Sequence, residues 1–540
     1  MTKGEIHMKQ KTGLLLALLL VLSAFLAACA GGGSADEGTK EDGTAPAADG
    51  EGGDLVLAVL SDASSLDPHG SNDVPSNNIH ANIYDTLVRL TPDSEIEPSL
   101  AKEWEQVDDT TWEFKLQEGV KFHDGEDFNA EAVKKSLDRV RDPEVGSPRF
   151  YLYEMINSVE AVDDYTVRIK TDYPFAPLLS HLAHDGGSMI SPKSIDADYA
   201  AMKEGKEPGS VISADPVGTG YFKFESWDPG SEIKLVKNED YWNGAPKADS
   251  VTLKVVPESA TRVAELETGN AHIIDPVQPN EVAQINDSGS AEVNQELSRS
   301  LSYLGFNTQK APFDDVRVRQ AISLMVDNDE IVEGIYDGFG IPAEGPLAPG
   351  SFGYDENIKG IEHNPEKAKK LLEEAGYGDG FKAEIWTNDN PQRVDIAVLL
   401  QQKLKDLNIE ISIQQMEFGA YLKQTAAGDH DMFILGWSNS TGDADNGLYS
   451  LFHSSQHGDA GNRSFYDNPE VDKLLDDGRK ETDPDARFAI YEKIQKTLIE
   501  DAPMVYIHHQ EYLTGVAGNV EGFTIDPSGI YQLKDVTITQ

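Results

Sequence analysis

Histidine and acidic side chains are the groups that would carry metal chemistry, and their spacing argues against it. His508 and His509 are adjacent on a predicted strand, where neighbouring side chains point to opposite faces, so they do not readily share one metal ion. His453 and His457 have the spacing of one helical face, but the serines and glycine around them indicate a loop. Residues 443–447 resemble a calcium loop only in part, because no glutamate follows at the required distance. We therefore expect no metal site and no cofactor.

Sequence signatures of common enzymes are absent. The chain has no Gly-x-Ser-x-Gly, no His-Glu-x-x-His and no Gly-x-Gly-x-x-Gly motif. We therefore expect a binding protein and assign no catalytic residue.

Polar and aromatic residues gather instead at the end of a predicted apolar strand, residues 432–436. In open α/β sheets ligands lie just beyond the carboxyl ends of strands, and hydroxyl, amide and indole groups there suit an amide-rich ligand. The alternative is an ordinary surface loop, although an indole is costly to leave on one. The predicted ligand contacts of this segment are Trp437, Ser438, Asn439, Ser440 and Thr441.

Charged groups near this segment are candidates for the two ends of a zwitterionic ligand. Arg463 is the proposed partner of a ligand carboxylate, and an internal salt bridge is its alternative. Arg393 has the same two interpretations with weaker support. Asp443 or Asp445 is the candidate partner of a ligand ammonium group.

The elements that must position these residues alternate between strands and helices. Strands are predicted at residues 55–60, 111–116, 166–170, 232–237 and 251–256, and helices begin after Asn129 and at residue 259. Beyond residue 307 the order strand 383–387, helix 394–407, strand 410–415, helix 419–427 and strand 432–437 is typical of an α/β lobe. From the first half, the loop after the first strand and the following helix offer weaker ligand candidates, Ser64, Ser65 and Tyr84.

Length and charge limit the class of protein. A chain of 540 residues exceeds what one core usually serves, and its hydrophobic fraction of 39% is enough for well-packed cores. The formal net charge of −49 repels phosphate backbones, so nucleic-acid binding is excluded. Two lobes joined by two chain crossings, near residues 304–307 and 505–516, are predicted, with a cleft and hinge between them.

The first residues predict export and lipid attachment. Lysines precede an apolar run at residues 14–22, and Leu26-Ala27-Ala28-Cys29 resembles a bacterial lipobox, with Cys29 the only cysteine. The alternative is an N-terminal membrane span. We expect residues 1–28 to be a signal peptide and residues 29–53 a lipidated cysteine followed by a disordered linker.

Across its length the sequence resembles family 5 of the extracytoplasmic solute-binding proteins of ABC importers, which bind dipeptides, oligopeptides, nickel or glutathione. The segments that carry this resemblance are residues 65–69, 82–87, 114–125, 216–222, 238–242, 304–308 and 313–321. The resemblance implies an α/β, two-lobed fold like that of periplasmic binding proteins (type II), in the large form with an extra subdomain. Lobe I is expected at residues 54–304, with an inserted subdomain at about 101–214, lobe II at 305–508, and a return to lobe I at 509–540.

The resemblance also implies a function. A dipeptide binder would carry an aspartate three residues after Trp437, where this chain has Ser440, and an arginine soon after residues 383–387, where residues 387–391 have none. Residues 437–445 instead resemble the glutathione-binding branch. We expect a monomeric peptide-binding lipoprotein, anchored outside a Gram-positive-type cell, that passes glutathione or short oligopeptides to a permease and its ATPase. The alternatives are a nickel or metal-chelate binder of the same family and a secreted lipoprotein hydrolase.

Overall fold

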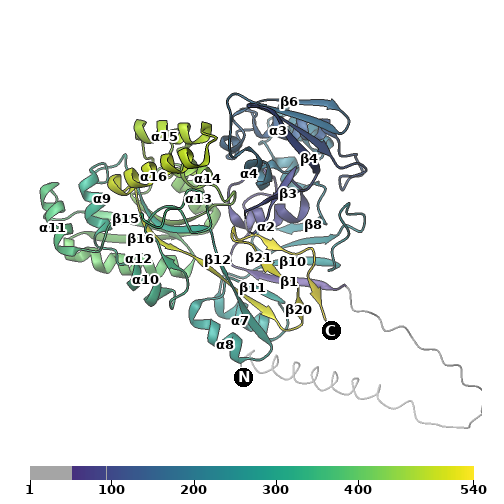
Figure 1. The fold of residues 1–540 in the computed structure, drawn as a ribbon. Coiled ribbons are helices and arrows are strands. Elements are labelled where there is room, and N and C mark those ends of the chain that lie inside the picture. The colour runs from purple at the N-terminus through teal and green to yellow at the C-terminus, as the bar shows by residue number, and fades with distance from the viewer. Residues whose placement is uncertain (1–51, 93, 540) are drawn as a thin grey trace, which may run out of the picture. The chain divides into compact units, whose positions relative to one another are not determined.

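Two mixed β-sheets, each covered by helices, organise the chain in the computed structural model, which describes residues 52–92 and 94–539 (Figure 1). The predicted signal peptide, Cys29 and nearly all of the predicted linker lie outside these residues. No helix within the described ranges is long and apolar enough to cross a membrane.

Lobe I is built on a seven-stranded sheet of order β12-β19-β11-β1-β10-β9-β8. Its three inner strands β1, β10 and β11 run parallel. The strands are β1 (Asp54–Val59), β8 (Phe222–Asp228), β9 (Glu232–Lys237), β10 (Ser250–Val255), β11 (Ile273–Asp275), β12 (Ala291–Leu297) and β19 (Glu511–Ala517), and the helices are α2 (Val74–Ile83), α7 (Ser259–Glu267) and α8 (Val282–Asp287). Short hairpins complete the lobe: β2 (Val88–Leu90) with β3 (Ile96–Pro98), β20 (Val520–Glu521) with β23 (Thr537–Ile538), and β21 (Thr524–Ile525) with β22 (Tyr531–Gln532).

A four-stranded antiparallel sheet of order β4-β5-β7-β6 lies within the range expected for the inserted subdomain. Helix α3 packs on this sheet and begins as predicted, because the Asn129 side chain accepts hydrogen bonds from the backbone N–H groups of Glu131 and Ala132. The elements are β4 (Ala101–Asp108), β5 (Thr111–Leu116), β6 (Ile156–Asp163), β7 (Thr166–Thr171), α3 (Ala130–Val140), α4 (Leu178–Ala183), α5 (Pro192–Lys203) and α6 (Ser210–Ala214).

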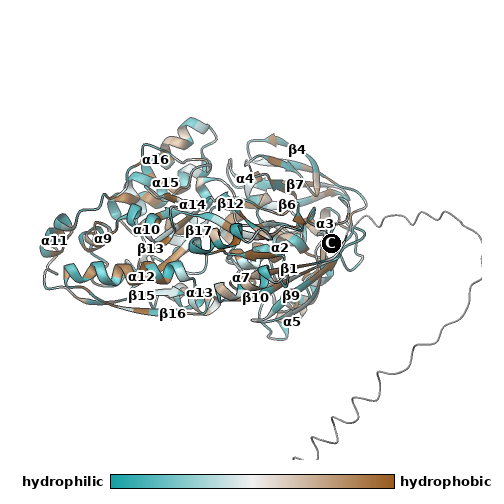
Figure 2. Cartoon of the chain, turned by 90° about the horizontal axis from the view of Figure 1, so that it is seen from below, coloured by the Kyte–Doolittle hydropathy of each residue, from teal (hydrophilic) through white to brown (hydrophobic). Residues whose placement is uncertain are grey.

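Lobe II is built on a six-stranded sheet of order β14-β18-β13-β17-β15-β16. Its strands are β13 (Ser300–Phe306), β14 (Ile341–Pro342), β15 (Lys382–Asn388), β16 (Glu410–Met416), β17 (Met432–Ser438) and β18 (Met504–His509). Its helices are α9 (Val316–Ser323), α10 (Asn328–Ile335), α11 (Pro365–Glu374), α12 (Pro391–Lys403), α13 (Phe418–Ala426), α14 (Ala444–Phe452), α15 (Pro469–Lys480) and α16 (Pro484–Asp501). Helix α12 carries both hydrophilic and hydrophobic residues in Figure 2, as expected of a helix that packs one face on a sheet.

The chain crosses between the two sheets at Ser298–Arg299 and at Gln510. The first crossing comes earlier than the expected boundary at residue 304, because all of β13 pairs with β17 in the sheet of lobe II. The second, between β18 and β19, lies within the predicted range.

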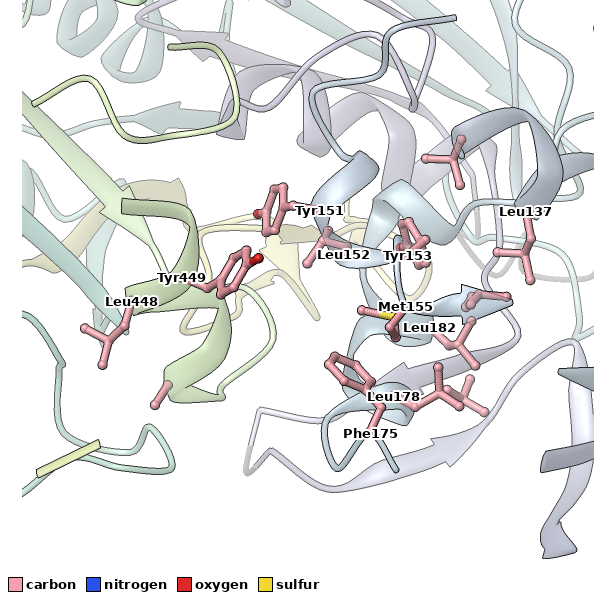
Figure 3. Packing of buried hydrophobic residues seen from close by; sticks show 14 of the residues in the cluster. Leu137, Tyr151, Leu152, Tyr153, Met155, Phe175, Leu178, Leu182, Leu448 and Tyr449 are labelled. Atoms are coloured by element: carbon pink, nitrogen blue, oxygen red, sulfur yellow. The ribbon is translucent and has the colours of Figure 1, made fainter. Parts of the chain in front are cut away.

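One buried apolar cluster runs from the inserted subdomain into lobe II. Figure 3 shows Tyr151 of the subdomain facing Tyr449 of α14, and Leu152 and Leu448 belong to the same cluster. The subdomain therefore packs against lobe II as well as being covalently part of lobe I.

Candidate functional site

A cavity of about 280 Å³ lies where the two sheets face each other. The carboxyl ends of β1 and β11 from lobe I, at Val59 and Asp275, and of β15 and β17 from lobe II, at Asn388 and Ser438, all contribute to its lining. This is the position at which α/β sheets bind ligands. The cavity is therefore the candidate site.

Trp437 lines this cavity because β17 separates from β15 before it ends. The two strands pair only at Ile385 with Met432 and Trp386 with Phe433, so the last residues of β17 are free of β15 and border the cavity. The buried indole Nε1 of Trp437 has no hydrogen-bond partner among the described residues. A buried donor without an acceptor costs about 1–3 kcal/mol, and a peptide carbonyl would remove that cost.

Arg463 also lines the cavity, and its guanidinium is nearly free of protein partners. The residue is 6% exposed, and its one ion pair is a 3.9 Å contact between Nη2 and an Asp459 oxygen. Its backbone is fixed by the loop, since its N–H donates to Gly461 O at 2.8 Å and its carbonyl lies 2.9 Å from His430 Nε2. A buried cation with so little compensation is unfavourable unless a ligand supplies negative charge.

Arg393 is a second cavity-lining arginine, in the first turn of α12. Its Nη1 donates to Asn388 Oδ1 at 2.9 Å, and none of the ion pairs among the described residues involves it. Gly436 of β17 lies against this guanidinium, because a Cβ there would be 3.1 Å from Arg393 Nη2. Residues 387–391 contain no arginine, but Arg393, two residues beyond them in the helix that follows β15, brings a guanidinium to the cavity.

The positive charges of Arg393 and Arg463 affect the pKa of the same two buried tyrosines. Burial raises the pKa of Tyr303 to about 12, and the positive charges of Arg463 and Arg393 oppose that rise. The pKa of Tyr421 is likewise raised by burial and opposed by both arginines. The two charges therefore lie in the same part of lobe II.

Lobe I presents carboxylates to the same cavity. Asp275 Oδ2 accepts a 2.6 Å hydrogen bond from the Tyr531 hydroxyl, and burial raises the pKa of Asp275. Asp62 accepts from Trp227 Nε1 at 3.1 Å, and Asp73 caps α2. The cavity thus has an acidic wall in lobe I, formed by Asp62, Asp73 and Asp275, and two arginines in lobe II. Arg149 of the inserted subdomain also lines it, but its guanidinium lies 3.2 Å from Asp185 Oδ2.

The residues that follow Trp437 divide into two groups. Ser438 and Ser440 line the cavity, and Ser438 Oγ donates to Ser528 O of lobe I at 2.7 Å. Asn439 and Thr441 are buried and are not among the lining residues, and Asn439 Nδ2 donates to Ser351 Oγ at 3.2 Å. Their expected ligand contacts are therefore not supported by their positions.

Asp443 and Asp445 are both held by arginines outside the cavity lining, which corrects their assignment as ammonium partners. Asp443 caps α14 and forms two 2.7 Å bonds with Arg487. Asp445 is fully buried, with Oδ1 2.8 Å from Arg479 Nε and Oδ2 3.0 Å from His181 Nε2. Neither carboxylate borders the cavity.

The three candidates from lobe I also lie outside the lining. Ser64 Oγ donates to Asp73, Ser65 Oγ accepts from the Asp67 N–H at 3.1 Å, and Tyr84 is buried with its hydroxyl 3.3 Å from Leu66 O. Residues 61–63, just before them, line the cavity instead. In this loop the cavity is therefore lined by positions one to four residues before Ser64 and Ser65.

A second cavity, of about 500 Å³, adjoins the first and shares Asn77, Ser440 and Ser528 with it. Tyr84 borders this second cavity. Its half-buried Asp85 accepts hydrogen bonds from Trp242, Tyr241 and Thr219, so that carboxylate is already satisfied by the protein.

His508 and His509 lie on β18 and have separate surroundings. His508 packs on the Tyr336 ring at 3.9 Å, while His509 Nδ1 lies 3.1 Å from Ser300 O. Within residues 52–92 and 94–539 no group of three or more His, Cys, Asp or Glu side chains is placed to hold a metal ion.

This geometry, with two lobes around a shared cavity, defines a solute-binding protein. The model of the family "Bacterial extracellular solute-binding proteins, family 5 Middle" matches residues 95–459, and the chain belongs to this family. Members of the family are extracytoplasmic binding components of ABC importers and not enzymes.

Individual relatives agree with this identification. The chain is 34% identical over 505 residues to the glutathione-binding protein GsiB of Pectobacterium atrosepticum, covering 90% of this chain and 94% of that one. The structure is similar, with a TM-score of 0.83 and 33% identity, to the Helicobacter pylori periplasmic binding protein DppA in complex with the peptide STSA, over 91% and 98% of the two chains. It is also similar to the Bacillus subtilis oligopeptide-binding protein AppA in complex with a nonapeptide, with a TM-score of 0.83, 30% identity and coverage of 91% and 99%.

Proposed function

We propose that this protein captures glutathione or short oligopeptides in the cavity between its lobes and delivers them, unaltered, to a membrane permease driven by an ATPase. The observation that carries the proposal is Arg463, a buried cavity-lining guanidinium with almost no partner in a chain that has 94 acidic residues. A peptide supplies the missing anion as its carboxylate. The names of the relatives, which bind glutathione or peptides, support the same class of ligand.

The other features of the cavity suit the rest of a peptide. Trp437 offers an N–H donor and an apolar face, and Ser440 offers a hydroxyl group. Asp275 takes the role first assigned to Asp443 or Asp445, as the carboxylate that binds the ligand ammonium group. Closure of the lobes excludes water, so that each of these polar contacts gains strength.

A thermal-shift screen tests this function. Bound ligand raises the apparent melting temperature by mass action, and glutathione and di- to pentapeptides are expected to do so, whereas sugars are not. Nickel salts test the metal-binding alternative, and intact ligand recovered after incubation tests against hydrolysis. Stabilisation by nickel or sugars but by no peptide would contradict the proposal.

We further propose that the mature chain begins at a lipidated Cys29 and is held at the outer face of the membrane. Cys29→Ala is expected to release the protein from the membrane fraction into the medium. Mass spectrometry of the N-terminal peptide measures the lipid directly, and an unmodified thiol would contradict this proposal.

A further inference from the structure

Arg463, which is buried, and Arg393, which is half-buried, have fewer hydrogen-bond acceptors than the buried arginines elsewhere in the described chain. Arg139 lies 2.8 Å from an Asp67 oxygen and 2.9 Å from an Asp198 oxygen. Arg319 has no carboxylate partner, but its nitrogens donate to the carbonyl oxygens of Phe313, Asp501 and Ala502. These two buried guanidinium groups therefore have several carboxylate or carbonyl acceptors each, although Nε of Arg139 has none among the described residues.

Arg393 and Arg463 have far fewer acceptors, also in comparison with Arg149, the third arginine that lines the cavity, which donates to Ser71 O, Asn77 Oδ1 and Asp185 Oδ2. Arg393 has one, the Asn388 side-chain oxygen at 2.9 Å, and no side-chain hydrogen bond of Arg463 is found among the described residues. A guanidinium group has five N–H donors in a planar arrangement that matches a carboxylate. Both groups therefore keep most of their donors available to the cavity.

Both arginines line the cavity, and their positive charges reach the same region of lobe II. Both act on Tyr303 and Tyr421, yet they come from different elements, the first turn of α12 and the loop that contains residue 463. One ligand carboxylate neutralises one positive charge and leaves the other without a counter-ion in a low-dielectric site. Two ligand carboxylates neutralise both.

The structure assigns to Arg393 and Arg463 the recognition of two separate carboxylates on one peptide. This inference rests on the proposed function and narrows it to peptides that carry a second acidic group, either a γ-linked glutamate or an acidic side chain. The ammonium group of such a peptide faces the acidic wall of lobe I, where Asp275 lies. The ligand class then has one positive and two negative charges.

Calorimetric titration with matched ligand pairs tests the inference. The pairs are Glu-Ala-Ala with Gln-Ala-Ala, and glutathione with its glycine monoethyl ester; in each pair the second member lacks one carboxylate. We expect the dicarboxylate to bind tenfold to a hundredfold more tightly, because the other member of each pair lacks a charge-assisted hydrogen bond to one of the arginines. Equal affinities in both pairs would overturn the inference and leave the proposed function intact.

Two variants assign the carboxylates. Arg393→Gln and Arg463→Gln are each expected to remove the preference within one ligand pair while the monocarboxylate of that pair still binds. Arg317→Gln, at an exposed arginine paired with Asp315 on α9, is the matched control and is expected to keep the wild-type preference. A preference that survives in both cavity variants would also overturn the inference. If the wild-type protein binds no peptide of either kind, the proposed function itself fails, and this inference fails with it.

Discussion

Asp445 is a buried charge with close partners and Arg463 is a buried charge almost without them, so substitutions at the two positions should affect stability differently. Asp445 is fully buried and contacts Arg479 of α15 and His181 of the inserted subdomain. Burial by itself raises the pKa of Asp445, but Arg479 and His181 outweigh that effect and hold the pKa below its usual range. Arg463, in contrast, faces the cavity with one 3.9 Å ion pair.

The expected magnitudes follow from these contacts. Asp445→Asn keeps the shape of the side chain but leaves Arg479 with Glu154, at 2.6 Å, as its remaining acidic partner. Breaking a buried ion pair costs about 3–5 kcal/mol. At roughly 2.1 cal/mol/K per residue over a folded unit of roughly 490 residues (Gly50–Gln540), this lowers the melting temperature by about 3–5 °C. Arg463→Gln removes a charge without a close partner, so the free energy of unfolding should stay within about 0.5 kcal/mol of wild type or rise.

Scanning calorimetry of the ligand-free protein measures both changes. Lys473 and Asp477 form an exposed pair within one helix, and Asp477→Asn is the control for loss of a carboxylate at the surface, with little change expected. Two results would contradict these expectations: a melting temperature of Asp445→Asn equal to that of wild type, or a melting temperature of Arg463→Gln lowered as much as that of Asp445→Asn.

Three further predictions concern the cavity and its surroundings. Gly436→Ala places a Cβ 3.1 Å from Arg393 Nη2 and should weaken glutathione binding severalfold in calorimetry, whereas Gly334→Ala in α10, with open space around it, should leave binding unchanged. Asp275→Asn should weaken binding of a peptide with a free amino group tenfold or more and leave its N-acetyl form unaffected, and equal losses for both would contradict its role. Burial lowers the pKa of His508 to about 3 in the folded protein. As the pH drops below about 6.5, this histidine is therefore protonated in the unfolded chain but not in the folded one, and stability falls. Between pH 8 and pH 5 the free energy of unfolding, measured with urea, should therefore fall by about 2 kcal/mol less in His508→Phe than in wild type. An identical fall in both proteins would contradict this prediction.

Local patterns predicted most of the secondary structure. Alternating side chains located β9 at Glu232–Lys237, and the cap at Asn129 located the start of α3. Each of these signals depends only on residues a few positions apart in the sequence. The first crossing between lobes was placed too late. The link Ser298–Arg299 is only two residues long and contains no glycine or proline, so the sequence carries no turn signal where the chain bends at Arg299 and enters the second sheet.

The sequence located only those cavity-lining residues whose place follows from their position along one strand. Trp437 and Ser440 line the cavity because they lie close to the carboxyl end of β17, and the apolar run at residues 432–436 indicates that strand in the sequence. Asp443 and Asp445 are neutralised by Arg487 and Arg479, more than thirty residues away, and such pairing depends on how helices pack. Arg393 is close to β15 in sequence, but its approach to the cavity depends on the start of α12 at Pro391.

A crystal structure of the protein with glutathione would test the central claim most directly, which is that the cavity between the lobes holds a peptide by its carboxylate on Arg463. We expect the ligand intact, with a carboxylate about 2.8 Å from the Arg463 guanidinium nitrogens and the indole of Trp437 in contact with it. Glutathione bound away from this cavity, or bound there with Arg463 turned to an acidic residue of the protein, would contradict the account.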